Sequence, residues 1–426
     1  MTKDPLLSQS RRDILLGASA GVMALSAPAR LRAATPKHVL VAGGGFAGST
    51  AAKYLRVWGD PSLQVTLVDP EKSHTSCVMS NLVLNRSLRL RDLRFPLSGL
   101  ESYGVTVLRA KVDKVDPAAM SVKLDSGETV GYDKLVLTGG VSFIGPDGWS
   151  ARTAPHAWKA GAQTTLLRNR IEAMPAGGTF IMTIPKSPYR CPPGPYERAC
   201  TVAEVLHSNP GARVVVLDAN AGIQATKVSF TRAFNELYSG IIDYRPNVEV
   251  ESVEAGAGLV HTNAGTFRGD VINIIPTHRA SALVRRAGAV PKGSKWAPVD
   301  PLSYASTLAG YENIHVIGDS QGTGQPKSGH MANAQAKVCA DAILRILAGE
   351  SIDTLARVRA VTTNSACFSP ITADEASWLT AVFAYDETTG EMRVVPGSLA
   401  ESGGWSRENY REMFDWSNNL WTDTFK

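Results

Sequence analysis

The sequence predicts an α/β protein with two Rossmann-like βαβ domains, one inserted into the other, and a smaller C-terminal α+β domain. Three observations support this prediction. A strand, a glycine-rich turn, a helix and a second strand follow one another near the N-terminus. A related strand–turn–helix segment lies near residue 310, and a separate βαβ pattern stands between the two. The 426 residues are also enough for two or three domains.

The first βαβ segment has the features of a dinucleotide-binding turn. K-H-V-L-V-A reads as a buried parallel strand, and G-G-G-F-A-G follows it directly. Gly43, Gly45 and Gly48 permit a tight turn and a close approach of the backbone to a pyrophosphate. The second strand ends at Asp69, 21 residues after Gly48, where an acid can bind a ribose hydroxyl. We therefore predict dinucleotide binding; the alternative is an ordinary glycine-tight turn.

The segment near residue 310 completes the same domain. A hairpin precedes a buried strand at 134–138, and N-I-H-V-I-G-D-S forms another strand with Gly318 and Asp319 at its end. Asp319 can bind the ribityl chain of a flavin. The long helix that begins near Ser328 can direct its N-terminal amides at a reduced flavin. The alternative is a plain βα unit.

The inserted βαβ pattern has an unusual turn. Its first strand, 179–185, is followed by K-S-P-Y-R-C-P-P-G-P-Y, then by a helix near 197–207 and a strand that ends at Asp218. Proline lacks an amide donor and fixes φ, so this turn is unsuited to a second pyrophosphate. We therefore expect no NAD(P)H binding here, and a thiol, Cys191, in its place.

These patterns divide the chain into segments. Residues 35–152 and 270–360 form the discontinuous FAD-binding domain, 153–269 the second Rossmann-like domain without a nucleotide cradle, and 361–426 the C-terminal domain. The C-terminal domain carries the strand-like W-L-T-A-V-F-A-Y-D and six aromatic residues between Trp405 and Phe425. We expect these aromatic residues to pack in the core as part of a C-terminal helix. The alternatives are that they form a lid over the flavin or a docking face.

The first 34 residues read as an export signal. Arg11 and Arg12 precede an apolar stretch, 14–25, that is too short to span a bilayer, and small residues follow it. This layout predicts a twin-arginine signal peptide and a periplasmic protein. The alternative is an amphipathic N-terminal helix. No later segment is predicted to be transmembrane.

Composition and motifs exclude several other functions. Lysine and arginine are scattered rather than clustered, so we predict no nucleic-acid partner. No H-x-x-H or H-E-x-x-H occurs, and we predict no metal site. The absence of C-x-x-C-H means that the chain cannot attach a c-type haem itself. Five cysteines leave at least one unpaired within the chain, and Cys200 and Cys339 are expected to pair with each other or to stay as buried thiols.

At this point the chain resembles the flavoprotein subunit of flavocytochrome c sulfide dehydrogenase, over nearly the whole mature length. The motifs that carry the resemblance are H-T-S-C-V-M-S-N, P-H-A-W-K-A-G, R-C-P-P-G-P-Y-E-R-A, H-V-I-G-D, P-K-S-G and N-N-L-W-T-D-T-F. The resemblance implies FAD, joined to Cys77 through a thioether at its 8α carbon. The alternative for Cys77 is a buried free thiol.

The resemblance also implies a redox-active disulfide between Cys191 and Cys367; the alternative is a structural staple. Hydrosulfide would attack one of the two sulfurs, and two electrons would pass to FAD. Glu197 is the candidate for accepting the proton of the incoming sulfur species, with helix capping or pairing with Arg198 as its alternative roles. Lys327 could stabilise the anionic reduced flavin, or could be a solvated lysine at a helix start.

The electron acceptor implied by the resemblance is a c-type cytochrome, either a permanent subunit or a soluble cytochrome c. Two alternatives remain at this stage. The chain could be a sulfide:quinone oxidoreductase, which requires an amphipathic membrane-binding segment and a quinone site. It could also be a redox-maintenance partner of a sulfur-carrier protein in thiosulfate oxidation.

Overall fold

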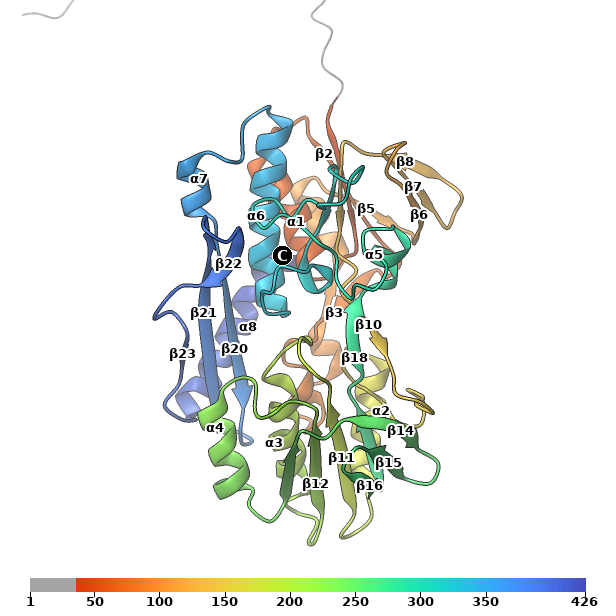
Figure 1. Cartoon of the computed structure of the whole chain (residues 1–426), viewed down its shortest axis with the longest axis vertical. Coiled ribbons are helices and arrows are strands. Elements are labelled where there is room, and N and C mark those ends of the chain that lie inside the picture. Colours follow the sequence, from red (N-terminus) through yellow and green to blue (C-terminus); the bar gives the residue numbers. More distant parts are fainter. Residues whose placement is uncertain (1–35) are drawn as a thin grey trace, which may run out of the picture. The chain divides into compact units, whose positions relative to one another are not determined.

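A five-stranded parallel sheet forms the first half of the fold (Figure 1). In spatial order its strands are β19 (Ile314–Val316), β9 (Lys134–Leu137), β1 (His38–Ala42), β2 (Gln64–Asp69) and β5 (Thr106–Arg109). All four pairings are parallel, and the three central strands are buried along nearly their whole length. Both faces of the sheet are covered, as its valine- and leucine-rich runs predict.

The computed structural model describes residues 36–426. The predicted signal peptide, residues 1–34, lies outside the described residues. Residues 36–426 cluster as one compact unit, so the domain boundaries within them stay a prediction.

Two long helices pack on the first sheet. They are α1 (Phe46–Trp58) and α6 (Gly329–Leu347). Figure 1 shows them side by side, and they contact each other along their length. The Ser328 hydroxyl caps α6 by accepting the amide of Met331 at 3.1 Å, which explains the helix start expected near that serine.

The inserted βαβ pattern forms a second parallel sheet of four strands. In spatial order these are β13 (Ile242–Pro246), β12 (Arg213–Asp218), β11 (Thr179–Ile184) and β17 (Val271–Ile274). The helices of this part are α2 (Ala162–Glu172), α3 (Gly194–Leu206) and α4 (Lys227–Arg232). The predicted strand ending at Asp218 and the helix after the proline-rich turn are both present.

The chain passes between the two sheets twice, through an antiparallel strand pair. The pair consists of β10 (Val141–Ile144) and β18 (Thr277–Ala280). Because β1, β2, β5 and β9 precede the second sheet and β19 follows it, the second sheet is an insertion into the first. This confirms the predicted α/β fold with two Rossmann-like sheets.

Short antiparallel segments and small helices complete these two parts of the fold. They are β3 (Ser73–Thr75), β4 (Arg94–Pro96), β6 (Val112–Asp116), β7 (Ser121–Leu124), β8 (Thr129–Gly131), β14 (Val250–Glu254), β15 (Leu259–Thr262), β16 (Gly265–Arg268) and α5 (Ala282–Arg286).

The C-terminal part is an antiparallel sheet with a long helix. Its elements are α7 (Leu355–Ala360), β20 (Thr362–Pro370), β21 (Ala376–Asp386), β22 (Glu391–Val394), β23 (Ala400–Glu401) and α8 (Arg407–Phe425). Trp421 and Phe425 of α8 are buried in the same core as α1 and α6. The Phe425 ring stacks on Phe95 with centroids 5.0 Å apart. The aromatic residues of this helix therefore serve mainly as core, as expected.

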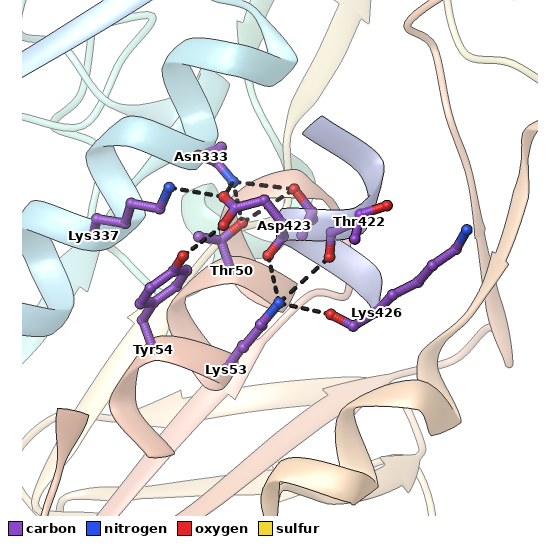
Figure 2. A network of polar contacts seen from close by, with 9 residues as sticks. Thr50, Lys53, Tyr54, Asn333, Lys337, Thr422, Asp423 and Lys426 are labelled. Atoms are coloured by element: carbon purple, nitrogen blue, oxygen red, sulfur yellow. Dashed lines mark hydrogen bonds and ion pairs between the residues drawn. The ribbon is translucent and has the colours of Figure 1, made fainter. Parts of the chain in front are cut away.

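Polar contacts fix the end of α8 against α1 and α6 (Figure 2). Lys53 of α1 donates from Nζ to the carbonyls of Thr422, Asp423 and Lys426, at 3.4, 3.0 and 2.6 Å. A lysine placed there offsets the negative end of the helix dipole. The Asp423 carboxylate accepts hydrogen bonds from Tyr54 and Asn333, at 2.5 and 2.7 Å.

Candidate active site

The turn between β1 and α1 has the close packing that the glycine motif predicts. Gly43 has a φ of +115°, which side-chain-bearing residues rarely adopt. A Cβ on Gly48 would lie 1.8 Å from the carbonyl oxygen of Gly43, so only glycine fits there. Gly45 precedes α1, whose N-terminus has no side-chain cap. The first amides of α1 thus remain available for an anion.

Asp69 ends β2 beside this turn. Its carboxylate accepts the amide of Gly44 at 2.6 Å and that of Glu71 at 2.8 Å. Burial raises the pKa of Asp69, while these two hydrogen bonds oppose the rise. The carboxylate is therefore held at the edge of the turn, where a ribose hydroxyl is expected.

A cavity of about 950 Å³, open to solvent, extends from the glycine turn to the end of β19. We call it the cofactor cavity. Its lining includes Gly43, Gly45, Asp69, Cys77, Lys159, Arg190, Gly318 and Asp319. The structure thus brings together the predicted glycine turn, the predicted ribose-binding acid and the predicted ribityl-binding acid.

A second cavity, of about 790 Å³, adjoins the first. We call it the thiol cavity, because Cys77, Cys191 and Cys367 all line it, together with Glu197. The two cavities share Cys77, Val78, Arg190, Ser328 and Gly329. Cys77 therefore lies where the cofactor cavity meets the other two thiols.

Cys191 is held in an uncommon backbone conformation. Its φ is +59°, although it is not a glycine, and its amide donates to the carbonyl of Lys327 at 2.7 Å. A Cβ on Gly194, at the start of α3, would lie 2.8 Å from the Cys191 sulfur. Backbone strain of this kind concentrates at functional sites. The proline-rich turn thus orients a thiol against a helix N-terminus.

Cys367 reaches the same cavity from the C-terminal sheet. It lies in β20, opposite Leu379 of β21. The amide of the preceding residue, Ala366, donates to Nδ1 of His330 at 2.9 Å. Because Nδ1 accepts, the neutral imidazole carries its proton on Nε2. His330 also lines the thiol cavity.

All five cysteines among residues 36–426 are unbonded thiols in the structure. Burial raises the pKa of Cys191, and the proximity of Cys367 and Glu197 adds to the rise. Burial likewise raises the pKa of Cys367 to about 12. Both groups are therefore neutral in this dithiol form.

Glu197 lies within a buried hydrogen-bonded network. Asn81 donates to its Oε1 at 2.8 Å and accepts from Nε of Arg198 at 3.0 Å. The Arg198 guanidinium also lies over the ring of Trp158, 4.6 Å from its centroid. Burial raises the pKa of Glu197 to about 7, although Asn81 and Arg198 oppose the rise. A carboxyl group with this pKa can exchange a proton near neutral pH.

Lys327 lies outside both cavities. Its Nζ donates to the carbonyl of Gln321 at 2.7 Å and sits 3.8 Å from the centroid of the Trp296 ring. It is buried rather than solvated, so the alternative of a solvated lysine is wrong. Its ammonium group lies outside the two cavities, although it is near enough to Asp319 for that carboxylate to oppose the fall in the lysine's pKa that burial causes.

Cys200 and Cys339 are fully buried in separate cores. Cys200 packs within α3 against the second sheet, whereas Cys339 packs within α6 against the first. Neither lines the thiol cavity. Their separation favours buried thiols over a mutual disulfide.

Three family models match the chain, and two of them describe one family. The central model of the sulfide dehydrogenase (flavocytochrome c) flavoprotein chain matches residues 164–276. The flavocytochrome c sulphide dehydrogenase flavin-binding model matches 359–425. A pyridine nucleotide-disulphide oxidoreductase model matches 37–165.

A sulfide dehydrogenase (flavocytochrome c) flavoprotein chain from Chlorobaculum thiosulfatiphilum is 53% identical over 47 residues, 11% of this chain and 96% of that sequence. The chain belongs to the flavocytochrome c sulfide dehydrogenase flavoprotein family. As a member it is a flavoprotein that binds FAD, and an FAD-dependent sulfide oxidoreductase. The expected resemblance is therefore confirmed.

More distant proteins share the fold. The sulfide:quinone oxidoreductase structure from Aquifex aeolicus superposes with a TM-score of 0.74 and 18% identity, covering 91% of each chain. The sulfide-quinone reductase sequence from the same organism is 31% identical over 129 residues, 28% of this chain and 30% of that one. Ferroptosis suppressor protein 1 of Taeniopygia guttata is 24% identical over 342 residues, 74% and 83% of the two chains.

The residues of this sulfide dehydrogenase flavoprotein fit FAD at the cofactor cavity. The glycine turn packs this closely only because Gly48 has no side chain, and Gly43 and Gly45 of the turn line the cavity. Arg190 also lines this cavity, and its Nη2 is buried without a hydrogen-bond partner. In the described part of the chain, no group of three or more histidine, cysteine or acidic side chains is arranged to hold a metal ion.

The site residues predicted from the sequence leave out several residues that line the two cavities. Asn81 and Trp158 line the thiol cavity, Lys159 lines the cofactor cavity, and Arg190 lines both. Trp158 and Lys159 belong to P-H-A-W-K-A-G and Arg190 to R-C-P-P-G-P-Y-E-R-A, so the motifs themselves pointed to them. Trp416 of α8 also lines the thiol cavity, so one aromatic residue of that helix has the position expected of a lid.

Proposed function

We propose that this chain is the flavoprotein of a periplasmic sulfide dehydrogenase. It oxidises sulfide to sulfur or polysulfide through a Cys191–Cys367 disulfide and passes the electrons through FAD to a c-type cytochrome. One observation carries the proposal: Cys77, Cys191, Cys367 and Glu197 line a single cavity that adjoins the cofactor cavity.

The sulfur chemistry is a thiol–disulfide exchange. Hydrosulfide attacks one sulfur of the oxidised pair, a bond forms between the substrate and that cysteine, and the Cys191–Cys367 bond breaks. The other cysteine leaves as a thiolate. FAD, when bound, would take up the two electrons given up as the disulfide re-forms, while the bound sulfur is released at the oxidation level of elemental sulfur or passes to a second sulfide as polysulfide. Each hydrosulfide thereby loses one proton and two electrons.

Glu197 accepts that proton in this proposal. Its pKa of about 7 leaves a substantial carboxylate fraction at neutral pH, and its hydrogen bond from Asn81 fixes its orientation. Cys191 and Cys367 both contribute to a cavity that also contains the Glu197 side chain. The base is thus available to whichever sulfur is attacked.

Cys77 holds the flavin in place by a thioether. Its position at the junction of the two cavities supports this role. FAD, when bound, supplies a two-electron acceptor that can release electrons one at a time. Acid-precipitated protein should retain the yellow colour, and Cys77→Ser should release it; colour found wholly in the supernatant of the unmodified protein would refute the covalent bond.

The acceptor and the compartment belong to the same proposal. A c-type cytochrome, as a subunit or a soluble protein, receives the electrons, and Arg11 and Arg12 direct export through the twin-arginine pathway. Replacement of both arginines by lysine should retain the precursor in the cytoplasm. Export of that variant at the normal level would remove the support for this route.

Sulfide:quinone oxidoreductase is the second candidate, because the fold superposes on one. A membrane-bound enzyme needs an exposed apolar surface, yet Met413, Leu420, Trp421 and Phe425 of α8 are buried in the protein core. No helix among residues 36–426 is long and apolar enough to cross a membrane. The burial of these side chains favours cytochrome c over a quinone as the acceptor.

Anaerobic mixing with sulfide tests the proposal. Sulfide should bleach the flavin of the unmodified protein, and oxidised cytochrome c should restore its colour faster than decylubiquinone does. Cys191→Ser should lose bleaching by sulfide while FAD stays bound, and Cys200→Ser, a buried thiol outside the cavity, should retain it. Bleaching of the Cys191→Ser protein at an unchanged rate would refute the role of the disulfide.

A further inference from the structure

Arg190 reaches from the proline-rich turn into the cofactor cavity. It precedes Cys191 in the turn that follows β11, yet its side chain lines both the cofactor cavity and the thiol cavity. Only 13% of that side chain is exposed. The turn that is expected not to bind a second nucleotide thus supplies a cation to the first nucleotide site.

The peptide group that joins Arg190 to Cys191 is held by two hydrogen bonds. The indole Nε1 of Trp158 donates to its carbonyl at 3.1 Å, and the amide of Cys191 donates to the carbonyl of Lys327 at 2.7 Å. The position of the guanidinium therefore follows from the same turn that orients the Cys191 thiol.

The guanidinium makes fewer hydrogen bonds to the protein than a buried charged group requires. Nη1 lies 3.7 Å from Oδ2 of Asp319, too long for a good hydrogen bond, and Nη2 is buried with no hydrogen-bond partner. A buried charged donor without a partner is costly. Arg190 lines the cavity that fits FAD, so its incompletely paired guanidinium points to a negative charge on the bound cofactor.

Several charged groups lie around this position. Lys159 and Arg190 line the cofactor cavity together with two carboxylates, Asp319 beside Arg190 and Asp69 at the glycine turn. Burial lowers the pKa of His156 and of His278, and the positive charge of Arg190 adds to the fall in both. Lys327, in contrast, directs its ammonium at Gln321 and Trp296.

We propose that Arg190 is the cation that stabilises the negative charge gained by the flavin on reduction, the role that the sequence suggested for Lys327. A flavin ring that takes up two electrons and one proton gains one negative charge. A guanidinium at the junction of the two cavities favours that form, and so raises the reduction potential. The inference rests on FAD binding, a part of the proposed function, but not on the sulfide chemistry.

The experiment measures the flavin midpoint potential of the purified holoprotein, with dithionite as reductant and reference dyes as indicators. Arg190→Gln should shift the reduction equilibrium at least tenfold toward the oxidised flavin, about 30 mV for two electrons. Arg190→Lys should recover most of that shift. Lys327→Gln removes the same charge outside the cavities and should change the equilibrium less than twofold, as should Lys186→Gln on the surface.

Sulfite binding gives a second readout that needs no reduction. Sulfite adds to oxidised flavin and leaves a negative charge on the ring, so its affinity should fall about tenfold in Arg190→Gln. If that variant does not fold, the same measurement on Arg190→Lys should show a smaller fall. Flavin content per protein chain should stay unchanged in both variants.

Three results would overturn the proposal. If Arg190→Gln and the unmodified protein had equal potentials and equal sulfite affinities, the guanidinium would have no influence on the flavin ring. Loss of flavin content at an unchanged potential would assign Arg190 to the cofactor phosphates instead. A larger shift in Lys327→Gln than in Arg190→Gln would return the role to Lys327. Because sulfide is absent, failure of the sulfide chemistry would leave these results unaffected.

Discussion

Asn81 donates a hydrogen bond of 2.8 Å to Glu197, and thereby joins two parts of the chain that carry cysteines. Asn81 follows Cys77 by four residues, and Glu197 follows Cys191 by six. The same amide nitrogen donates to the carbonyl of Gly194 at 3.2 Å, at the start of α3. The hydrogen bond therefore fixes the candidate base relative to both the segment that contains Cys77 and the proline-rich turn.

The first prediction concerns the pH dependence of flavin reduction by sulfide. Glu197 must be ionised to accept a proton, so the rate should rise with pH through about 7. Because sulfide itself ionises near neutral pH, the informative quantity is the ratio of the rates of the unmodified protein and Glu197→Gln. This ratio should rise through the same range. A ratio that does not vary with pH would show that another group takes the proton.

Asn81→Ala sharpens that test. The hydrogen bond from Asn81 stabilises the Glu197 carboxylate. Loss of this hydrogen bond should therefore move the midpoint of the pH profile upward. Asn85→Ala is the matched control, since Asn85 only accepts the exposed amide of Ser87 in the same segment. Stopped-flow rates between pH 5 and 9 measure both variants. A downward shift in Asn81→Ala would contradict the described role.

The second prediction concerns stability. The Glu197 carboxyl has its pKa raised from 4.5 to about 7 in the folded chain. Between these values the folded chain holds a proton that the unfolded chain releases, so the free energy of unfolding falls as pH rises through this window. The loss is roughly 3 kcal/mol in total. Thermal unfolding of Glu197→Gln should show a flatter pH dependence there, whereas an identical pH dependence would contradict the raised pKa.

The third prediction uses the close contact between Gly194 and the Cys191 sulfur. In Gly194→Ala the new methyl group would lie 2.8 Å from that sulfur and 3.0 Å from the Trp158 ring. Cys191 must then move, and sulfide-driven flavin reduction should slow at least tenfold with flavin content unchanged. Gly222→Ala is the control, because nothing lies within 4 Å of its added Cβ. Equal rates in the two variants would mean that the sulfur position is not critical.

The fourth prediction concerns the attachment of α8. Lys53→Met removes the donor to three carbonyls at the end of the helix, which should lower the free energy of unfolding by about 1–3 kcal/mol. Lys37→Met removes only an exposed pair with Asp133, for which about 0–1 kcal/mol is expected. Chemical denaturation compares the two, and an equal loss in both would contradict the anchoring role of Lys53.

Local patterns predicted the framework of the site. Three predicted parts of the site lie at the carboxyl ends of strands: the glycine turn at Gly43–Gly48, Asp69 and Asp319. Parallel strands bring these ends to one edge of a sheet. The grouping of Cys77, Cys191 and Cys367 came from the family resemblance, because residues so far apart in the sequence are joined only by tertiary packing.

Side-chain direction was harder to predict. Lys327 stands at the start of α6 as expected, yet its side chain turns toward Trp296, which lies on a distant segment. Arg190 was overlooked because the prolines and the cysteine dominate its turn. Asn81 has no motif that marks it, and its role depends on contacts with α3, more than one hundred residues away.

The most direct test of the account maps the cysteines of the oxidised protein. Free thiols are alkylated, the protein is digested, and the peptides are identified by mass spectrometry before and after anaerobic sulfide treatment. We predict that the peptides with Cys191 and Cys367 are joined in the oxidised protein, that sulfide makes both alkylatable, and that Cys200 and Cys339 are free thiols throughout. Full alkylation of Cys191 in the oxidised protein, or its linkage to Cys200, would contradict the account.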